Sequence, residues 1–193
     1  MMRRATAAEE RMIVAAMAAH GVSVREVWVL PGEAVGAWAP VRGRMRIREG
    51  FFAAPPRRQR AILAHEAGHV IGRHWLRCVV LASVLEGVLV AARFLLAPAI
   101  LSAWWTIPLG GVGVAVSEVF VWVIVAAVGR RQEHLADRWA IEHGGISLET
   151  YAEHLAGVEH LKGMGWVDRL LASHPTPERR MRVLWGAMGG GKQ

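Results

Sequence analysis

One stretch of 51 residues, from Cys78 to Val128, contains only three charged side chains, whereas the rest of the chain is densely charged. The three are Glu86, Arg93 and Glu118. A chain of 193 residues has little else with which to bury so large an apolar segment inside a soluble fold. We therefore predict that this segment crosses a membrane.

The apolar stretch divides into two segments, 76–96 and 107–128. Each is long enough to cross a hydrocarbon core of about 30 Å. We therefore predict a two-helix transmembrane hairpin over 76–128. Its short connection would place Trp104 and Trp105 at the membrane interface, where aromatic residues are enriched. Two buried helices of a soluble protein are the alternative.

The arginines beside the hairpin predict its orientation. Two precede the first span and two follow the second, at positions 73, 77, 130 and 131. The connection between the spans contains no lysine or arginine. Because positively charged residues stay on the cytoplasmic side, we expect both termini to be cytoplasmic.

Composition excludes other classes of protein. Hydrophobic residues make up 53% of the chain, which excludes a disordered chain. The single cysteine, Cys78, excludes a disulfide framework and a CxxC motif. The net charge is +7, but the arginine runs lack the aromatic interleaving or reading helix of a nucleic-acid-binding protein. We therefore expect the lipid bilayer, and not nucleic acid, as their partner.

The segments around the hairpin predict an α+β fold that is mostly helical, with a small N-terminal sheet. Before the hairpin we expect a helix at 7–19, a strand at 24–30, a β-hairpin of 34–39 and 45–52, and a helix at 57–76 that continues into the first span. After the hairpin we expect helices at 130–143, at 148–164 with Ser147 as its cap, and at 177–188. The whole chain, 1–193, is then one minimal domain in three parts: 20–75, the hairpin at 76–128, and a C-terminal helical part at 129–188.

The most informative motif is His65-Glu66-Ala67-Gly68-His69. On a helix, residues four apart share a face, so His65 and His69 can bind one metal ion. Zinc held by two imidazoles and a carboxylate lowers the pKa of a bound water toward ~7. Glu66, beside the histidines, could take the proton as that water attacks a peptide carbonyl. Five residues are a weak pattern alone, and a charged helix without a metal is the alternative.

A second helix offers a third ligand. Glu133 and Asp137 are also four apart on one face. Glu133 can bind zinc, and Asp137 can accept a hydrogen bond from the outer nitrogen of a ligand histidine. The first span begins just after His69 and the second ends just before Glu133. An antiparallel hairpin would therefore bring the two motifs together at one membrane surface.

Three sequence blocks together resemble a known family. They are Ala61–His69 with Arg73-His74 after it, Glu133–Arg138, and Ser173–Arg180. In their order and spacing they resemble the HtpX family of integral membrane zinc metallopeptidases. These are gluzincins, and their relatives include the type I CAAX prenyl endopeptidase. The resemblance covers roughly residues 20 to 185 and implies a membrane-anchored metalloprotease domain.

The resemblance implies a role for each matched residue. His65, His69 and Glu133 would bind one zinc ion per chain, and Glu66 would be the general base. Asp137 would orient a ligand histidine.

The resemblance also implies roles for residues farther along the chain. His174 would stabilise the oxyanion near the scissile carbonyl, and Arg180 would pair with a carboxylate. The strand containing Gly36–Ala39 would lie against an extended substrate, although Gly36 stands where the family usually has Asn. Typical members also have two further membrane helices before the zinc motif, which this sequence does not show.

We therefore predict a membrane-bound zinc endopeptidase with its site at the cytoplasmic face, in the cytoplasmic membrane of a prokaryote. Its substrates would be membrane or membrane-associated proteins, as in protein quality control. A zinc-binding membrane adaptor without proteolytic activity is the first alternative, and the intact Glu66 argues against it. An intramembrane protease of the site-2 type is the second, and the arginines just before the motif argue against it.

Overall fold

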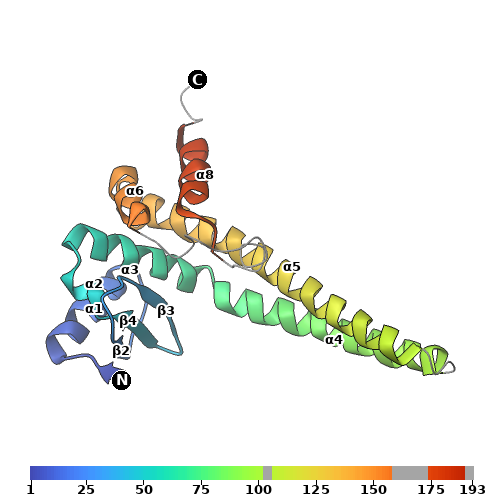
Figure 1. The fold of residues 1–193 in the computed structure, drawn as a ribbon. Helices are drawn as coiled ribbons and strands as arrows, with labels where there is room; N and C mark the ends of the chain where they lie inside the picture. The colour runs from blue at the N-terminus through green and yellow to red at the C-terminus, as the bar shows by residue number, and fades with distance from the viewer. Residues whose placement is uncertain (102–105, 158–173, 190–193) are drawn as a thin grey trace. The chain divides into compact units, whose positions relative to one another are not determined.

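The computed structural model describes residues 1–101, 106–157 and 174–189 (Figure 1). The strands in this part of the chain are β1 (Arg3–Arg4), β2 (Glu26–Leu30), β3 (Ala37–Val41) and β4 (Arg44–Arg48). The helices are α1 (Ala7–Ala19), α2 (Gly50–Ala53), α3 (Pro56–Ile71), α4 (His74–Leu101), α5 (Thr106–Glu142), α6 (Leu148–Ala156) and α8 (Pro177–Gly189). The chain is therefore mostly helical with one small sheet, as the sequence predicts.

The chain forms two compact units. The first contains residues 1–74 and the described parts of 132–162 and 175–193. The second contains the described parts of 75–131 and, separately, His174. The C-terminal end of α5 therefore belongs to the first unit, which also contains the residues of the candidate metal centre described below.

The sheet has the strand order β1-β2-β4-β3. β2 and β4 run parallel, and β3 pairs antiparallel with β4 at one edge. Side chains alternate between the two faces of a strand. Val27, Val29, Met45 and Ile47 lie on the face toward the core and are fully or almost fully buried. The intervening arginines of β4 lie on the other face. β1 pairs antiparallel with β2 and was not predicted.

The tight turn between β3 and β4 is made by Arg42 and Gly43, whose φ angles are +52° and +79°. Two consecutive positive φ angles are typical of a two-residue hairpin turn. The predicted strand at 45–52 is wrong at its end, because β4 stops at Arg48 and α2 follows. This single helical turn buries Phe51 completely. The Gln59 side-chain amide donates to the carbonyl oxygens of α2.

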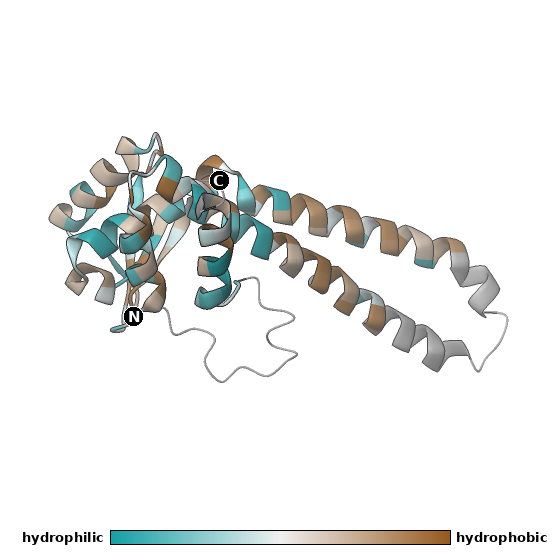
Figure 2. Cartoon of the chain, turned by 90° about the horizontal axis from the view of Figure 1, so that it is seen from above, coloured by the Kyte–Doolittle hydropathy of each residue, from teal (hydrophilic) through white to brown (hydrophobic). Residues whose placement is uncertain are grey.

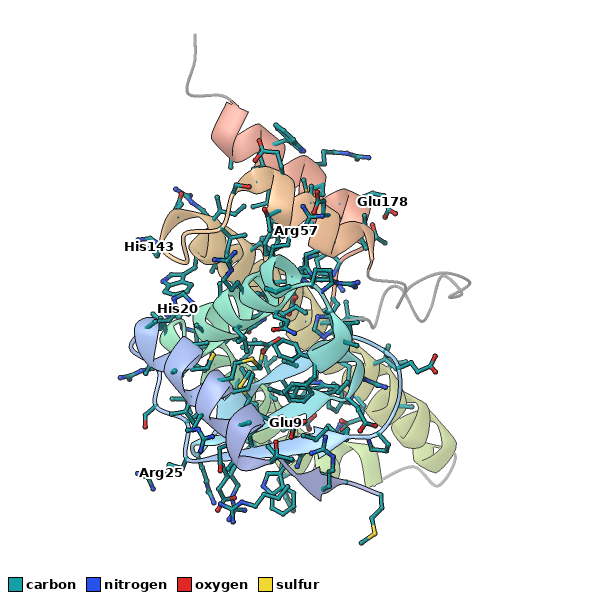
Figure 3. All side chains as sticks on the ribbon, turned by 90° about the vertical axis from the view of Figure 1, so that its left-hand side faces the viewer. Glu9, His20, Arg25, Arg57, His143 and Glu178 are labelled. Carbon is teal, nitrogen blue, oxygen red and sulfur yellow. The ribbon has the colours of Figure 1, made fainter. Side chains whose placement is uncertain are left out.

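Helix α1 has the predicted bounds and packs against the sheet. Thr6 caps it, with Glu9 closing a capping box (Figure 3). Its Ile13 and Met17 are fully buried in the cluster that also contains the inward side chains of β2 and β4. Two apolar residues of α3, Ile62 and Leu63, belong to the same cluster. This core fixes one face of the helix that carries the His65–His69 motif.

The helix predicted at 57–76 is interrupted, and this is a correction. α3 ends at Ile71, a turn follows at Gly72 and Arg73, and α4 begins at His74. Arg73 has a φ of +50°, which a continuous right-handed helix does not contain. The first span therefore starts from a separate helix.

Helices α4 and α5 form an antiparallel hairpin whose described side chains are largely hydrophobic (Figure 2). Within the described residues, one helical segment, His74–Leu95, is long and apolar enough to cross a membrane. Arg93 of α4 donates to Glu118 at 2.9 Å and to Ser117 at 2.7 Å, both on α5. Two of the three charges that interrupt the apolar stretch, Arg93 and Glu118, thus pair across the two helices.

The remaining helices differ from the prediction in their lengths. α4 continues past Pro98, where the first span was expected to stop, and α5 runs without a break through Gly129. An isolated glycine costs a helix only about 1 kcal/mol, so it need not end one. Ser147 caps α6 as predicted, by accepting from the amide of Thr150. The residues 158–164 of the predicted helix, and Trp104 and Trp105, lie outside the described residues.

Candidate metal centre

Two histidines and a glutamate converge where α3 meets the C-terminal end of α5. The Nε2 atoms of His65 and His69 lie 3.0 Å apart. In Glu133, Oε2 lies 3.5 Å from Nε2 of His65, and Oε1 lies 3.2 Å from Nε2 of His69. One ligand atom from each residue falls within 4.8 Å of the others. Nitrogen and oxygen donors in this number and spacing fit a metal ion of the zinc type.

Close contact between the two helices makes this convergence possible. A β-carbon on Gly68 would lie only 3.0 Å from the Cα of Ala136. Glycine at this position therefore lets the two backbones approach. Ala64 of α3 and Ala140 of α5 are fully buried in a second cluster with Tyr151 of α6. Small residues along the contact set the distance across which Glu133 reaches the two histidines.

The outer nitrogen of His65 meets a buried polar network. Its Nδ1 lies 2.9 Å from Oδ1 of Asp137 and 2.9 Å from the hydroxyl of Tyr151. Tyr151 donates to the same Asp137 oxygen at 2.6 Å. Burial alone would lower the pKa of the His65 imidazole, but the carboxylates of Asp137 and Glu133 raise it to about 9. Because Nδ1 lies against the Asp137 carboxylate, its proton points to Asp137, while Nε2 faces Glu133 and His69.

Arg180 on α8 completes this network. Its Nε donates to Oδ2 of Asp137 at 2.8 Å, and its Nη2 donates to Oδ1 of the same residue. Burial raises the pKa of the Asp137 carboxyl, but the guanidinium of Arg180 outweighs burial and holds that pKa well below its ordinary value. Burial also raises the pKa of the Tyr151 hydroxyl, which therefore stays protonated. Three separate helices thus hold one carboxylate behind His65.

Glu66 lies beside the histidines and also near the edge strand. Burial raises the pKa of its carboxyl, while His65, His69 and the backbone of Ala39 on β3 lower it in part. The net shift of this pKa is upward. The carboxyl of Glu66 thus lies near both histidines and the backbone of the edge strand.

The other predicted residues are placed as follows. Arg180 lies on Asp137, so it does pair with a carboxylate. His174 is exposed, precedes α8 and belongs to the second unit. Its role at an oxyanion stays a prediction.

Two residues of the site were not recognised from the sequence. Tyr151 is the only tyrosine of the chain, and nothing in its spacing marks it. His74 is the other, and its Nδ1 lies 2.9 Å from Nδ1 of the candidate ligand His69. Neither contact follows from helical periodicity.

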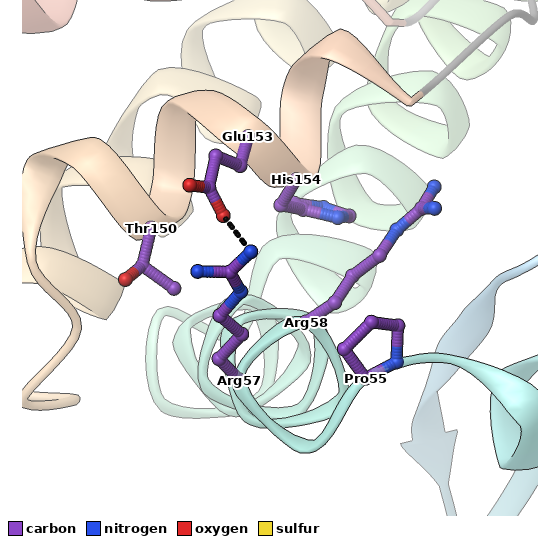
Figure 4. A pocket seen from close by; sticks show the side chains of 6 residues that line it. All are labelled: Pro55, Arg57, Arg58, Thr150, Glu153 and His154. Atoms are coloured by element: carbon purple, nitrogen blue, oxygen red, sulfur yellow. Dashed lines mark ion pairs between the residues drawn. The ribbon is translucent and has the colours of Figure 1, made fainter.

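Other histidines do not join the cluster. His20 meets the ring of Trp139 edge to face, with centroids 5.5 Å apart, and His143 stacks on it with centroids 5.9 Å apart; both histidines are labelled in Figure 3. His154 meets Tyr151 edge to face, with ring centroids 5.6 Å apart. His154 lines a pocket of about 280 Å³ with Arg57, Arg58, Pro55, Thr150 and Glu153 (Figure 4).

Comparisons with known proteins agree with this geometry. The model of peptidase family M48 matches residues 5–187. The crystal structure of S. mikatae Ste24p is similar with a TM-score of 0.69 and 16% sequence identity. That similarity covers 95% of this chain and 50% of the other, so this chain spans about half the length of that protein. At this identity the likeness shows the fold. No curated protein matches the chain.

Proposed function

The chain belongs to peptidase family M48, a family of zinc metallopeptidases, and we propose that it is a zinc-dependent endopeptidase anchored in a membrane by the α4–α5 hairpin. Family membership confirms the resemblance to HtpX-like metallopeptidases. The observation that carries the proposal is the convergence of His65, His69 and Glu133 within 4.8 Å. These three residues would hold one zinc ion per chain.

A zinc ion held there supplies Lewis acidity, which polarises a peptide carbonyl and makes a water molecule more acidic. The proton transfers of the reaction are carried out by the chain's own residues. Glu66 takes the proton of the attacking water and passes it to the leaving amine. Burial raises the pKa of its carboxyl, which makes the carboxylate a stronger base than an exposed one.

The buried network behind His65 keeps the ligand in position. Asp137 accepts from Nδ1 of His65, so the Nε2 lone pair would be left free to bind a metal ion. Arg180 and Tyr151 hold Asp137 in turn. Ligand orientation is therefore set by α5, α6 and α8 together.

Strand β3 is the proposed surface for substrate. It lies at an edge of the sheet and packs against α3. An extended peptide could pair with its free backbone groups, as in other cases of strand addition. Because Ala39 lies near Glu66, such a peptide would pass beside the general base. His174 would then donate to the developing oxyanion.

The setting of the enzyme follows from the hairpin and its flanking arginines. We place the active site at the cytoplasmic face of a prokaryotic cytoplasmic membrane, with both termini inside. Substrates would be membrane or membrane-associated proteins, as protein quality control requires.

A single substitution tests the proposal. Glu66→Gln keeps the shape of the side chain but removes the proton acceptor. We expect detergent-purified Glu66→Gln protein to hold about one zinc ion per chain, as the wild type does. Its cleavage of an unfolded membrane protein should fall by about 10²-fold or more. His65→Ala is the matched control and should lose most of the metal.

Two outcomes would contradict the proposal. Unchanged cleavage by Glu66→Gln would exclude Glu66 as the base. Zinc binding by a wild type without peptidase activity would favour the membrane adaptor.

A further inference from the structure

His74 folds back onto a candidate zinc ligand. Its Nδ1 lies 2.9 Å from Nδ1 of His69, and the two rings meet edge to face with centroids 4.9 Å apart. His74 is only 4% exposed. The imidazole thus occupies, behind His69, the place that Asp137 occupies behind His65.

The turn between α3 and α4 has a backbone conformation that accommodates this contact. A β-carbon on Gly72 would lie 2.2 Å from Nε2 of His74, so a glycine is needed to admit the ring. Arg73 adopts a φ of +50°, which costs a residue with a side chain about 1 kcal/mol or more. Both features are unfavourable for a helix, and both serve to bring His74 under His69.

The protonation pattern of the pair follows from the geometry. Two Nδ1 atoms at 2.9 Å share one proton. If His74 held it, neutral His69 would carry its own proton on Nε2 and could not bind a metal there. If His69 holds it, Nδ1–H donates to His74, and the Nε2 lone pair faces His65 and Glu133.

Resting on the proposed zinc site, we propose that His74 is a positioning residue, which accepts the Nδ1–H of His69 and so fixes the ring orientation and tautomer in which His69 binds the metal. The two ligand histidines then have different supports. His65 is held by a charged network and His69 by a second imidazole. The turn at Gly72 and Arg73 is part of the site, because it delivers His74.

The test compares zinc affinities of full-length protein in detergent, by competition with a chelator. His74→Phe keeps a buried ring but has no acceptor, and its zinc affinity should fall about 10- to 100-fold. His74→Asn places an amide oxygen near the former Nδ1, and its affinity should stay within about threefold of the wild type. His143→Phe, at an exposed histidine, is the matched control and should change nothing.

Gly72→Ala provides a second route that leaves His74 chemically intact. Its added methyl group displaces the ring, so zinc affinity should fall as in His74→Phe. Thermal unfolding at saturating zinc checks that each variant folds. If His74→Phe does not fold, the zinc affinities of Gly72→Ala and His74→Asn test the role of His74. Equal affinity in all variants, or equal loss in His74→Asn and His74→Phe, would overturn the role of His74. A wild type that binds no zinc would instead overturn the proposed function.

Discussion

Asp137 is fully buried and still ionised, because Arg180 lies against both of its carboxylate oxygens. A buried charge whose partner is removed costs about 3–5 kcal/mol, whereas one neutral hydrogen bond contributes about 0.5–1.5 kcal/mol. Arg180 and Tyr151 therefore contribute unequally to the stability of the buried carboxylate. Arg180 keeps Asp137 ionised, and Tyr151 adds one hydrogen bond that orients it.

We expect Arg180→Met to lower the free energy of unfolding by about 3–5 kcal/mol. Tyr151→Phe should lower it by only about 1 kcal/mol and weaken zinc binding by about 10-fold. Denaturant unfolding at saturating zinc measures the first quantity, and chelator competition measures the second. Equal losses of stability in the two variants would show that Asp137 is not held as an ion by Arg180.

His154 predicts a pH dependence of stability. Burial, together with the charges of His65 and Arg180, lowers the pKa of its imidazole to about 3. The unfolded chain binds this proton near the ordinary pKa of 6.5, so acid favours unfolding. Its contribution to stability is complete above about pH 6.5 and is lost as the pH falls toward 3.

His154→Phe keeps a ring against Tyr151 but cannot titrate. Metal-free wild type should therefore lose more stability than metal-free His154→Phe between pH 6.5 and pH 3. The comparison needs unfolding midpoints of both proteins at several pH values. Parallel curves would mean that His154 is not buried in its neutral form.

At the scale of the elements, the contact between α3 and the end of α5 decides whether the ligands meet. The backbones approach at Gly68 and Ala136. A methyl group at Gly68 meets backbone, which cannot rotate away as a flexible side chain does. One helix must then shift, and the distance from Glu133 to the histidines shifts with it.

We expect Gly68→Ala to destabilise the first unit by about 1–3 kcal/mol, as overpacking does, and to weaken zinc binding. Gly186→Ala is the matched control, because Gly186 lies in α8 with no atom within 4 Å of an added β-carbon. That substitution should be neutral or slightly stabilising. If both variants bound zinc like the wild type, close helix contact would not set the geometry of the site.

The parts of the fold that depend on local periodicity were predictable. α1 has the expected bounds. A spacing of four residues predicted that His65 and His69 share one helix face, and that Glu133 and Asp137 share another. The parts that depend on distant contacts were not. Tyr151 reaches His65 across 86 positions of sequence, and no local pattern records that.

The break between α3 and α4 was also not predicted. The residues around Gly72 are compatible with one continuous helix, because neither proline nor a polar run interrupts them. The contact that accompanies the break is short in sequence, since His74 meets His69 only five positions away, but helical periodicity does not predict it. Similarly, β1 consists of two arginines, Arg3 and Arg4, which form a strand only because β2 offers an edge.

At the scale of the whole molecule, charge is distributed around one apolar hairpin. The chain has 23 basic and 16 acidic residues, and few of either sign lie between 78 and 128. A lysine or arginine at the centre of a membrane helix costs about 2.5–3.5 kcal/mol. The pair between Arg93 and Glu118 offsets part of that cost inside the hairpin. The arginines at its two ends predict which side of the membrane these ends occupy.

Reporter fusions test this arrangement. Two arginines stand before the first span, at 73 and 77, and two after the second, at 130 and 131, while the connection at 97–106 has none. Both ends should therefore remain in the cytoplasm and the connection should cross. A reporter enzyme active only outside the cytoplasm should work when inserted in the connection and fail when fused after Gln193. Adding two lysines to the connection should weaken this bias, because the excess of positive charge on the cytoplasmic side then falls from about four to about two. If the reporter instead works only after Gln193, the orientation is reversed, and the proposed zinc site acts on substrates outside the cytoplasm.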